Sequence, residues 1–337
     1  MWRELAGSRI FITGGTGFFG KWMLESIAAA NDALKVSVGA TVLSRDPQRF
    51  LARMPHLASR TEFHWIHGHP AIFSFPKAHH DYVLHLATAT SAHLGQTDPV
   101  EMLKNKLSSI AHVLDYARQT GSRRMLVSSS GAVYGRQPAE LKRIPESYCG
   151  APNPMSPASA YGEGKRLVEQ MCALAPEVDT VIARCFSFIG PHLPLDARFA
   201  VGNFLRDAMV GGPIVIQGDG SAIRSYLHAA DMVIWLLTLL LHGEAGRAYN
   251  VGSDEAVSTL QMAKRIACCS ATACSIEVRE SPGTFSADTY VPDISHAKLG
   301  LGLDVWISFD QAVKRTWSAL TTIMAQHRTD DPGTRAE

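Results

Sequence analysis

The sequence predicts an α/β protein built on a doubly wound parallel sheet, with a smaller lobe in its C-terminal half. Short apolar runs alternate with amphipathic runs of helix length through roughly the first half of the chain, which is the pattern of strands joined by crossover helices. The run at 82–87 is apolar almost without interruption, as expected for a strand covered on both faces. After about residue 184 the alternation becomes irregular and richer in Pro and Gly, which predicts a separate lobe.

Each expected element follows from one of these runs. The first strand is expected at 9–13 and the first helix at 18–30, with a glycine-rich turn between them. Further strands are expected at 40–43, 62–66, 82–87 and 125–129, and further helices at 100–119 and 158–173. The very apolar segment 232–241 is too short to span a bilayer and predicts a buried helix.

Three parts of the chain are expected. Residues 1–185 are predicted to form the domain of the parallel sheet, and 186–327 mainly the smaller lobe, with segments that return to the sheet. The tail 328–337 is polar with Pro and Gly, and we expect it to be disordered.

The composition excludes several classes of function. Lys and Arg number 32 and Asp and Glu number 31, so no basic excess indicates a nucleic-acid partner. The N-terminus has no apolar signal-peptide core, and we expect a cytoplasmic protein without a membrane partner. The six cysteines are scattered, with no CxxC pair and no histidine at metal-ligand spacing, so reduced thiols and no metal site are expected.

The glycine-rich turn at 13–20 has the residues that a dinucleotide needs. Gly14 permits a tight turn, Gly17 lets the backbone approach a pyrophosphate, and Gly20 lets the helix pack closely on the strand. The helix N-terminus adds free N–H groups and positive potential. A purely structural turn is the alternative, but the position between a strand and a helix favours a Rossmann-type cofactor site. The expected cofactor contacts here are Gly14, Thr16, Gly17, Phe18, Phe19 and Gly20.

The end of the second strand bears on the choice between NAD and NADP. An acidic residue at this place usually binds the adenosine ribose of NAD, whereas this chain has Ser44 followed by Arg45. Because a guanidinium binds phosphate bidentately, Ser44 and Arg45 are expected to bind the cofactor, and NADP is favoured over NAD. The alternatives are that Asp46 binds the ribose, or that Arg45 is only a solvated loop residue.

Three residues are candidates for catalysis. Tyr161 and Lys165 are one helical turn apart and share a face. A phenol of pKa about 10 is a poor base at neutral pH, and the ammonium of Lys165 is expected to lower that pKa while also binding the nicotinamide ribose. Ser130 ends the serine-rich stretch after the strand 125–129, and is expected to orient the substrate and pass its proton to Tyr161. A plain serine-rich turn is the alternative.

With these motifs the sequence resembles the extended short-chain dehydrogenase/reductases, specifically the nucleotide-sugar epimerase/dehydratase family, over roughly residues 8–325. The segments 82–88, 224–231, 249–252 and 291–295, and the long helix that contains Asn105, also carry the resemblance. It implies further cofactor contacts from Leu86, Ala87, Thr88, Asn105 and Ser128. It also implies a nucleotide-diphosphate sugar as substrate, bound by Ser130, Ser187, Asn203, Arg224 and Asn250. An internal salt bridge is the structural alternative for Arg224.

The chain departs from the family pattern at three places. Gly131-Ala132 stands where the family's dehydratases have Asp-Glu, and the related decarboxylases also use an acidic residue in this stretch. Removing a hydroxyl needs a base and an acid, which neither Gly nor Ala supplies. Ser187 stands where the family often has Asn, and Gly68-His69 replaces a frequent Gly-Asp at the adenine site.

The resemblance, together with the missing acid pair, makes a C4 epimerase with a 4-keto intermediate the first expectation. A 4-keto-sugar reductase that consumes NADPH is the close alternative, because the same three residues serve either direction. A 4,6-dehydratase is disfavoured, and a non-catalytic nucleotide-sugar or NADP sensor is the alternative from another class. The helices 100–119 and 158–173 resemble those of the family's dimer interface, so a homodimer is expected, unless their apolar residues only face the sheet.

Overall fold

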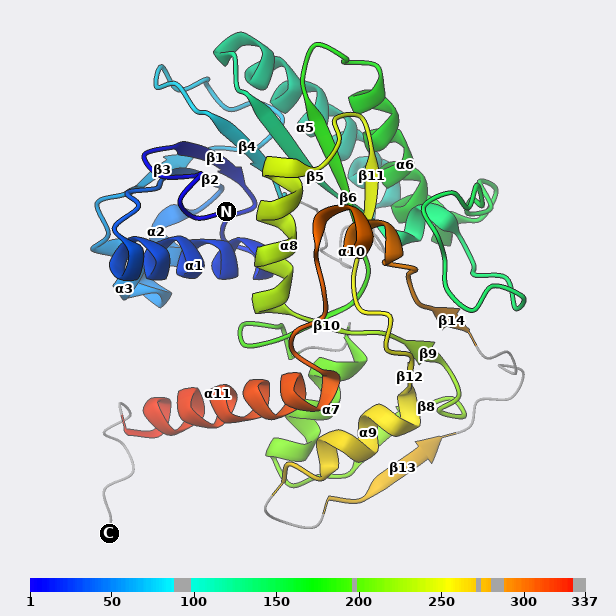
Figure 1. The fold of residues 1–337 in the computed structure, drawn as a ribbon. Helices are drawn as coiled ribbons and strands as arrows, with labels where there is room; N and C mark the ends of the chain where they lie inside the picture. The colour runs from blue at the N-terminus through cyan, green and yellow to red at the C-terminus, as the bar shows by residue number, and fades with distance from the viewer. Residues whose placement is uncertain (88–97, 196–198, 271–273, 280–287, 330–337) are drawn as a thin grey trace.

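The structure is a computed structural model that describes residues 1–87, 98–195, 199–270, 274–279 and 288–329. Thr88 and nearly all of the expected tail lie outside the described residues. A sheet and the helices on its two faces form the larger part of the molecule, and a smaller group of helices and short strands lies below it (Figure 1).

The central sheet has seven parallel strands in the order β3-β2-β1-β4-β5-β6-β11. Their bounds are β1 Arg9–Thr13, β2 Gly39–Ser44, β3 Phe63–His67, β4 Tyr82–His85, β5 Arg124–Ser130, β6 Thr180–Cys185 and β11 Ala248–Val251. The chain order reverses between β1 and β4, and ligands of such sheets bind in the crevice beyond the strand ends at this point. The predicted fold class and all five predicted strands are confirmed, within two residues at their ends.

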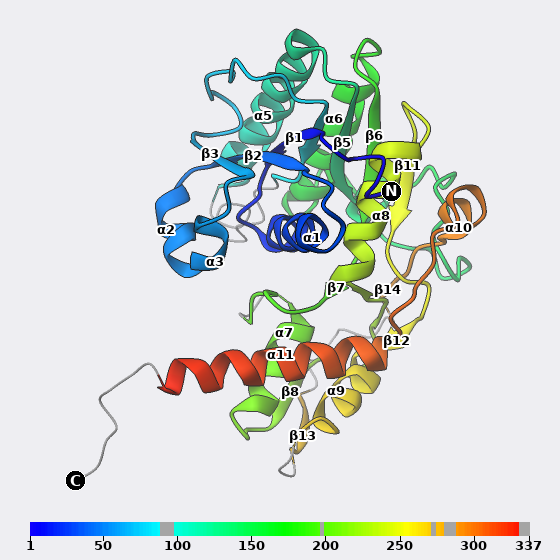
Figure 2. The ribbon, with the colours of Figure 1, turned by 60° about the vertical axis from the view of Figure 1, so that its left-hand side comes forward.

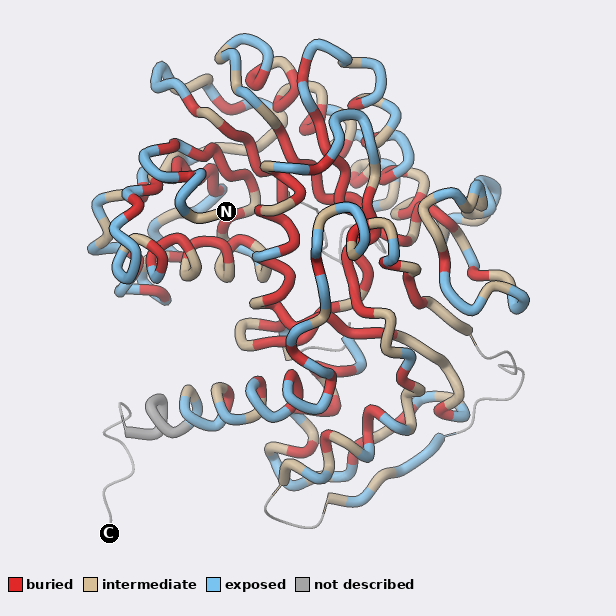
Figure 3. Tube along the Cα trace, viewed as in Figure 1, coloured by how far each residue is buried: buried red, intermediate tan, exposed pale blue. Residues whose placement is uncertain are grey.

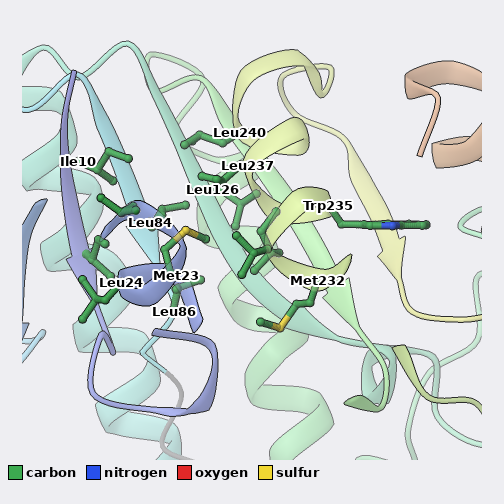
Figure 4. Packing of buried hydrophobic residues seen from close by; sticks show 14 of the residues in the cluster. Ile10, Met23, Leu24, Leu84, Leu86, Leu126, Met232, Trp235, Leu237 and Leu240 are labelled. Carbon is green, nitrogen blue, oxygen red and sulfur yellow. The ribbon is translucent and has the colours of Figure 1, made fainter. Parts of the chain in front are cut away.

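Helices cover both faces of the sheet. On one face lie α1 (Phe18–Leu34) and α8 (Ala229–His242), and on the other lie α5 (Pro99–Thr120) and α6 (Ala160–Ala173) (Figures 1 and 2). Figure 4 shows side chains of α1 and α8 packed against the strands. The labelled residues of this core are Ile10, Met23, Leu24, Leu84, Leu86, Leu126, Met232, Trp235, Leu237 and Leu240.

Local sequence explains where several helices begin. Asp98 caps α5 by accepting a hydrogen bond from the N–H of Glu101, and proline occupies the first helical position after it. The helix α2 (Pro47–Arg53) begins in the same way, with Asp46 as its cap. The apolar segment predicted as a buried helix forms most of α8, whose residues are largely buried (Figure 3).

The lobe has its own hydrophobic core, formed mainly by α7 (Ala200–Met209), β8 (Ile214–Gln217), α9 (Thr259–Ala267) and α11 (Phe309–Thr329). β11, α8 and α10 return to the sheet, so the chain passes between the two parts more than once (Figure 2). The described residues contain no helix that combines the length and the apolar content needed for a bilayer crossing. The remaining bounds are α3 Pro55–Ala58, η1 Gly131–Tyr134, η2 Pro157–Ser159, β7 Phe188–Ile189, β9 Ile223–Arg224, β10 Leu227–His228, β12 Val257–Ser258, β13 Ile276–Arg279, β14 Thr289–Tyr290 and α10 Ser295–Leu301.

Candidate active site

The glycine turn between β1 and α1 leaves no room for side chains at Gly14 and Gly20. Gly14 has φ of 74°, and a Cβ there would lie 2.5 Å from the backbone nitrogen of Ala87. A Cβ on Gly20 would collide with the backbone of Gly15, so the helix packs on the turn itself. Gly17 is exposed at the start of α1 and offers no side-chain cap to its N–H groups. These N–H groups and the glycine cradle fit the pyrophosphate of a dinucleotide.

The end of β4 is tied to this turn. Thr13 Oγ1 lies 2.8 Å from His85 Nδ1 and accepts a hydrogen bond from the N–H of Ala87. Burial, followed by the charges of Lys165 and Lys106, lowers the pKa of His85 to about 3. His85 is therefore neutral at physiological pH and links the buried ends of β1 and β4 through Thr13.

A pocket of about 550 Å³ lies beside the glycine turn at the end of β2. Burial, and then the charge of Arg53, lowers the pKa of Lys21. The carboxylate of Asp46 accepts a hydrogen bond from the N–H of Arg49 and so serves as the cap of α2. Four basic side chains line the pocket beside one carboxylate, so the pocket has a surplus of positive charge. Its lining residues are Thr16, Lys21, Ser44, Arg45, Asp46, Arg49, Phe50, Arg53 and Met54. Lys21, Arg49 and Arg53 were not predicted, because they become neighbours of Arg45 only when α1 and α2 fold over the turn.

Ser130 and Tyr161 are brought together from β5 and α6. Ser130 is the last residue of β5, and its Oγ accepts a hydrogen bond of 3.2 Å from the N–H of Ala132. Burial raises the pKa of Tyr161 to about 12, opposed by its hydrogen bond with Ser130. This is the serine–tyrosine contact that the sequence predicted.

The expected effect of Lys165 on Tyr161 needs a correction. The Nζ of Lys165 donates a hydrogen bond of 2.5 Å to the carbonyl of Ser128, and its side chain is almost fully buried. Burial lowers the pKa of Lys165 to about 8. The pKa of Tyr161 is raised and not lowered, because desolvation of the phenolate outweighs the other influences in this structure.

Tyr290 is a functional candidate that the sequence did not indicate. It belongs to β14 of the lobe, and its ring packs against Phe186 with centroids 4.6 Å apart. A Cβ on Gly131 would lie 2.5 Å from the Tyr290 hydroxyl. Burial raises the pKa of Tyr290, opposed by a hydrogen bond with Ser130. The residue stands just outside the segment 291–295, and no local spacing connects it with Ser130.

Two predicted substrate residues are engaged in internal contacts. Arg224 makes an ion pair of 2.5 Å with Asp288 and stands 5.8 Å from the ring centroid of Tyr290, so the salt-bridge alternative is present in the structure. Asn250 is fully buried, and the structure corrects its expected role. Its Oδ1 accepts from the hydroxyl of Tyr134, and its Nδ2 donates to two backbone carbonyls. These bonds leave its side chain no donor for a ligand.

The other predicted residues differ in their burial and in their hydrogen bonds. Leu86 is buried, and the backbone of the next residue, Ala87, lies against Thr13 and Gly14 of the glycine turn. Ser128 donates its hydroxyl to the carbonyl of His85, and Asn105 donates to Glu101 within α5. Ser187 is half-buried after β6. The Oδ1 of Asn203 on α7 is buried without a hydrogen-bond partner in the described part of the chain, which suits a ligand contact.

A family model described as the NAD dependent epimerase/dehydratase family matches residues 10–252. The UDP-glucuronic acid decarboxylase 1 of Xenopus tropicalis is 28% identical over 325 residues, with 91% of this chain and 71% of that protein covered. The UDP-glucuronic acid decarboxylase 2 of Arabidopsis thaliana is 29% identical over 315 residues, covering 91% of this chain and 67% of that protein.

Solved structures are similar over almost the whole length. An epimerase of Methanothermobacter thermautotrophicus has a TM-score of 0.81 at 24% identity, covering 98% of this chain and 96% of that chain. The UDP-glucose 4-epimerase of Thermotoga maritima, solved with UDP-glucose, has a TM-score of 0.79 at 20% identity, covering 94% and 99%. At these identities the likeness concerns the fold, and it agrees with the doubly wound sheet and the added lobe.

Proposed function

The chain belongs to the NAD dependent epimerase/dehydratase family and is an enzyme, and on this premise we propose that it uses NADPH to reduce the C4 carbonyl of a 4-keto nucleotide sugar. The membership confirms the resemblance drawn from the motifs and leaves the non-catalytic sensor without support. The substrate class, the direction of the reaction and the choice of NADP are the proposal.

The observation that carries this proposal is the set of groups around Ser130. Within the described residues, the hydroxyl of Ser130 forms hydrogen bonds with the N–H of Ala132 and with the hydroxyls of Tyr161 and Tyr290. The side chain of the lobe that lies beside Gly131 is Tyr290, a phenol whose pKa is raised by burial. A neutral phenol cannot take a proton from carbon as a carboxylate does. The site therefore favours simple transfer of hydride and a proton over dehydration.

The names of the curated relatives do not decide the reaction. The two described above are UDP-glucuronic acid decarboxylases, and the resemblance implies an acidic residue after the serine in such enzymes. Here Gly131 and Ala132 follow Ser130, and Tyr290 with Phe186 fills the space beside Gly131. We therefore carry over the nucleotide-sugar substrate class and not the decarboxylation.

The pocket at the end of β2 supports NADP as the cofactor. Lys21, Arg45, Arg49 and Arg53 line it, and its single acidic residue caps α2. A ribose hydroxyl needs a carboxylate partner at such a place, whereas a 2′-phosphate needs cations. The bound dinucleotide would supply hydride to the sugar.

Tyr161 is the proton donor in this proposal. Hydride arrives at C4, the carbonyl oxygen takes the proton of Tyr161, and the resulting phenolate is reprotonated from solvent. A serine hydroxyl has one donor and two acceptor positions, and Ala132, Tyr161 and Tyr290 already use them. The sugar oxygen therefore takes the place of Tyr290 at Ser130, while Lys165 stays beside Ser128 to meet the nicotinamide ribose.

C4 epimerisation, the first expectation from the sequence, is kept as the second candidate. The contact between Ser130 and Tyr161 supports it equally, because a tyrosine that donates a proton in reduction accepts one in oxidation. An epimerase returns its cofactor to the starting state and has no need to exchange it. The surplus of cations in the open pocket supports the reductase instead, because an exchanging NADPH must be recognised at every turnover.

The test is to purify the protein, identify any bound cofactor, and incubate it with UDP-, dTDP-, GDP- and CDP-linked sugars and 4-keto sugars. Loss of NADPH absorbance near 340 nm with a 4-keto substrate, and formation of the C4 alcohol, is the expected result. Isomerised sugar without net change of cofactor would assign the epimerase. Loss of carbon dioxide or water from the sugar would overturn the proposal.

A homodimer through α5 and α6 is also a proposal. Most apolar residues of α5 are buried against the sheet, in agreement with the alternative noted from the sequence. Val100 and Leu167 remain exposed, at 61% and 42%. Light scattering on the purified protein measures the state directly, and charged substitutions at both positions should dissociate a dimer.

A further inference from the structure

We propose that Lys106 is a second lysine of the catalytic centre, a cation under the ring of Tyr161 that stabilises the phenolate formed during the reaction. The inference rests on the proposed role of Tyr161 as the proton donor. It concerns a residue that neither the glycine turn nor the serine–tyrosine–lysine set includes.

The geometry of Lys106 is unusual for a lysine. It lies in α5 with a side chain only 7% exposed, and its Nζ stands 4.3 Å from the centroid of the Tyr161 ring. Within the described residues this Nζ has no hydrogen-bond partner. Lys104, two positions earlier on the same helix, is exposed in the ordinary way. The ammonium of Lys106 is therefore removed from water and lies over the ring of Tyr161.

The sequence of α6 makes room for this side chain. A Cβ on Gly164 would lie 2.8 Å from Cδ of Lys106 and 3.4 Å from its Cε. Gly164 stands between the catalytic Tyr161 and Lys165 in the helix, where alanine would be the better helix former. The same Cβ would lie 2.9 Å from Cδ2 of Leu103, so the glycine keeps space for the side chains of both Lys106 and Leu103.

The fold gains little from this arrangement. A buried ammonium without hydrogen bonds is among the costliest groups in a protein interior, and attraction to an aromatic face returns only part of that cost. The balance changes when Tyr161 loses its proton, because the ring then carries a full negative charge beside the ammonium. The interaction is thus strongest in the transition state, which is the requirement for a contribution to rate.

The surroundings determine the charge of Lys106. Burial, and then the charge of Lys165, lowers the pKa of Lys106 to about 7. His85 on β4 is neutral, Glu169 on α6 pairs with Arg184, and burial keeps the thiol of Cys185 protonated. Glu101 on α5 accepts from Asn105, and Tyr290 is a neutral phenol. Lys106 is therefore charged below about pH 7 and neutral above it, so reduction should slow as the pH rises through this value.

The test compares Lys106→Met with Lys104→Met, each measured for NADPH affinity, melting temperature and kcat between pH 5.5 and 9. Lys106→Met should lose about 10- to 100-fold in kcat at pH 6 and should lose the fall of kcat near pH 7. Its cofactor affinity should stay within about threefold, and its melting temperature should be equal or higher, because a buried charge is removed. Lys104→Met should behave as the unmodified protein.

A second variant, Gly164→Ala, should displace the stem of Lys106 and lower kcat in the same sense, with the helix itself favoured. If the wild type is active and Lys106→Met has the same kcat and the same pH profile, the inference is overturned. A loss of kcat that only follows a lower melting temperature would overturn it as well, since the role would then be structural.

A measurement without turnover separates this inference from the proposed function. In protein labelled with ¹³C at the lysine ε-carbons, one resonance absent from Lys106→Met should titrate near pH 7. A resonance that titrates above pH 10 overturns the inference even if the enzyme is active. A wild type that turns over no sugar overturns the proposed function, while the titration still decides whether a switchable cation exists.

Discussion

The two ends of the crevice both carry positive charge but hold it in different surroundings. At the glycine turn, Lys21, Arg45, Arg49 and Arg53 line an open pocket. At the end of β5, Lys106 and Lys165 are almost completely buried, and their pKa values fall to about 7 and about 8. The three arginines of this pocket are exposed to water and are suited to hold an anion. The buried cations titrate near neutral pH and are suited to follow the ionisation of Tyr161. We infer that one end selects the cofactor and the other sets the rate.

The largest expected effect is at the buried end. Tyr161→Phe removes only the hydroxyl that donates the proton, and kcat should fall by about 10²- to 10⁴-fold. NADPH affinity, measured by fluorescence quenching, should change by less than about threefold, because the open pocket is intact. The control is Tyr148→Phe, a half-buried phenol beside Tyr134. If Tyr161→Phe keeps most of its kcat, the inference that the buried end sets the rate is wrong.

The next effect is at the open end. Replacing both Arg45 and Arg49 by Ala should weaken NADPH binding by about 10- to 100-fold, because charge-assisted hydrogen bonds to the 2′-phosphate are lost. NADH binding and kcat at saturating cofactor should change by less than about threefold. Arg279→Ala, an exposed arginine on β13 of the lobe, is the control. An equal loss of affinity for NADPH and for NADH would show that the pocket does not bind the 2′-phosphate.

A smaller effect is expected where the lobe meets the buried end. Gly131→Ala places a methyl group against the hydroxyl of Tyr290 and the ring of Phe186, so stability should fall by about 1–3 kcal/mol and kcat by about tenfold. Combining it with Tyr290→Phe removes the nearest atom and should restore part of the loss, which a double-mutant cycle measures. Gly300→Ala, with no atom within 4 Å of its new Cβ, is the control. Additive losses would place Tyr290 outside the catalytic centre.

The smallest effect separates the two ends by their response to pH and salt. Between pH 6.5 and 7.5, kcat of the reduction should fall about threefold, because Lys106 with a pKa of about 7 changes from mostly protonated to mostly neutral. Added salt should weaken NADPH binding through the open cations but leave kcat nearly constant. An affinity that is insensitive to salt, together with a kcat that is insensitive to pH, would contradict the contrast between open and buried charge.

The predictable residues share one property, a fixed distance along one element or one turn. The glycines of the first turn, the four-residue spacing of Tyr161 and Lys165, and the position of Ser130 at a strand end could all be read from the chain. Lys106 and Tyr290 could not, because each reaches the centre from a separate element, α5 or β14. Asn250 was placed at a ligand by its motif, yet its amide is used by Tyr134 and two carbonyls. The pKa of Tyr161 was expected to be lowered, whereas burial raises it, and burial cannot be judged from spacing.

The amino-acid sequence by itself determined the doubly wound sheet, the glycine turn, and the position of Ser130 at a strand end, since these depend on periodicity and on local spacing along the chain. Only the tertiary structure decided which charges are buried and which are open, and which lobe side chain meets position 131. The reason is that the pKa of an ionisable group depends on the solvent and charges around it. Those surroundings are assembled from segments that lie far apart in the chain.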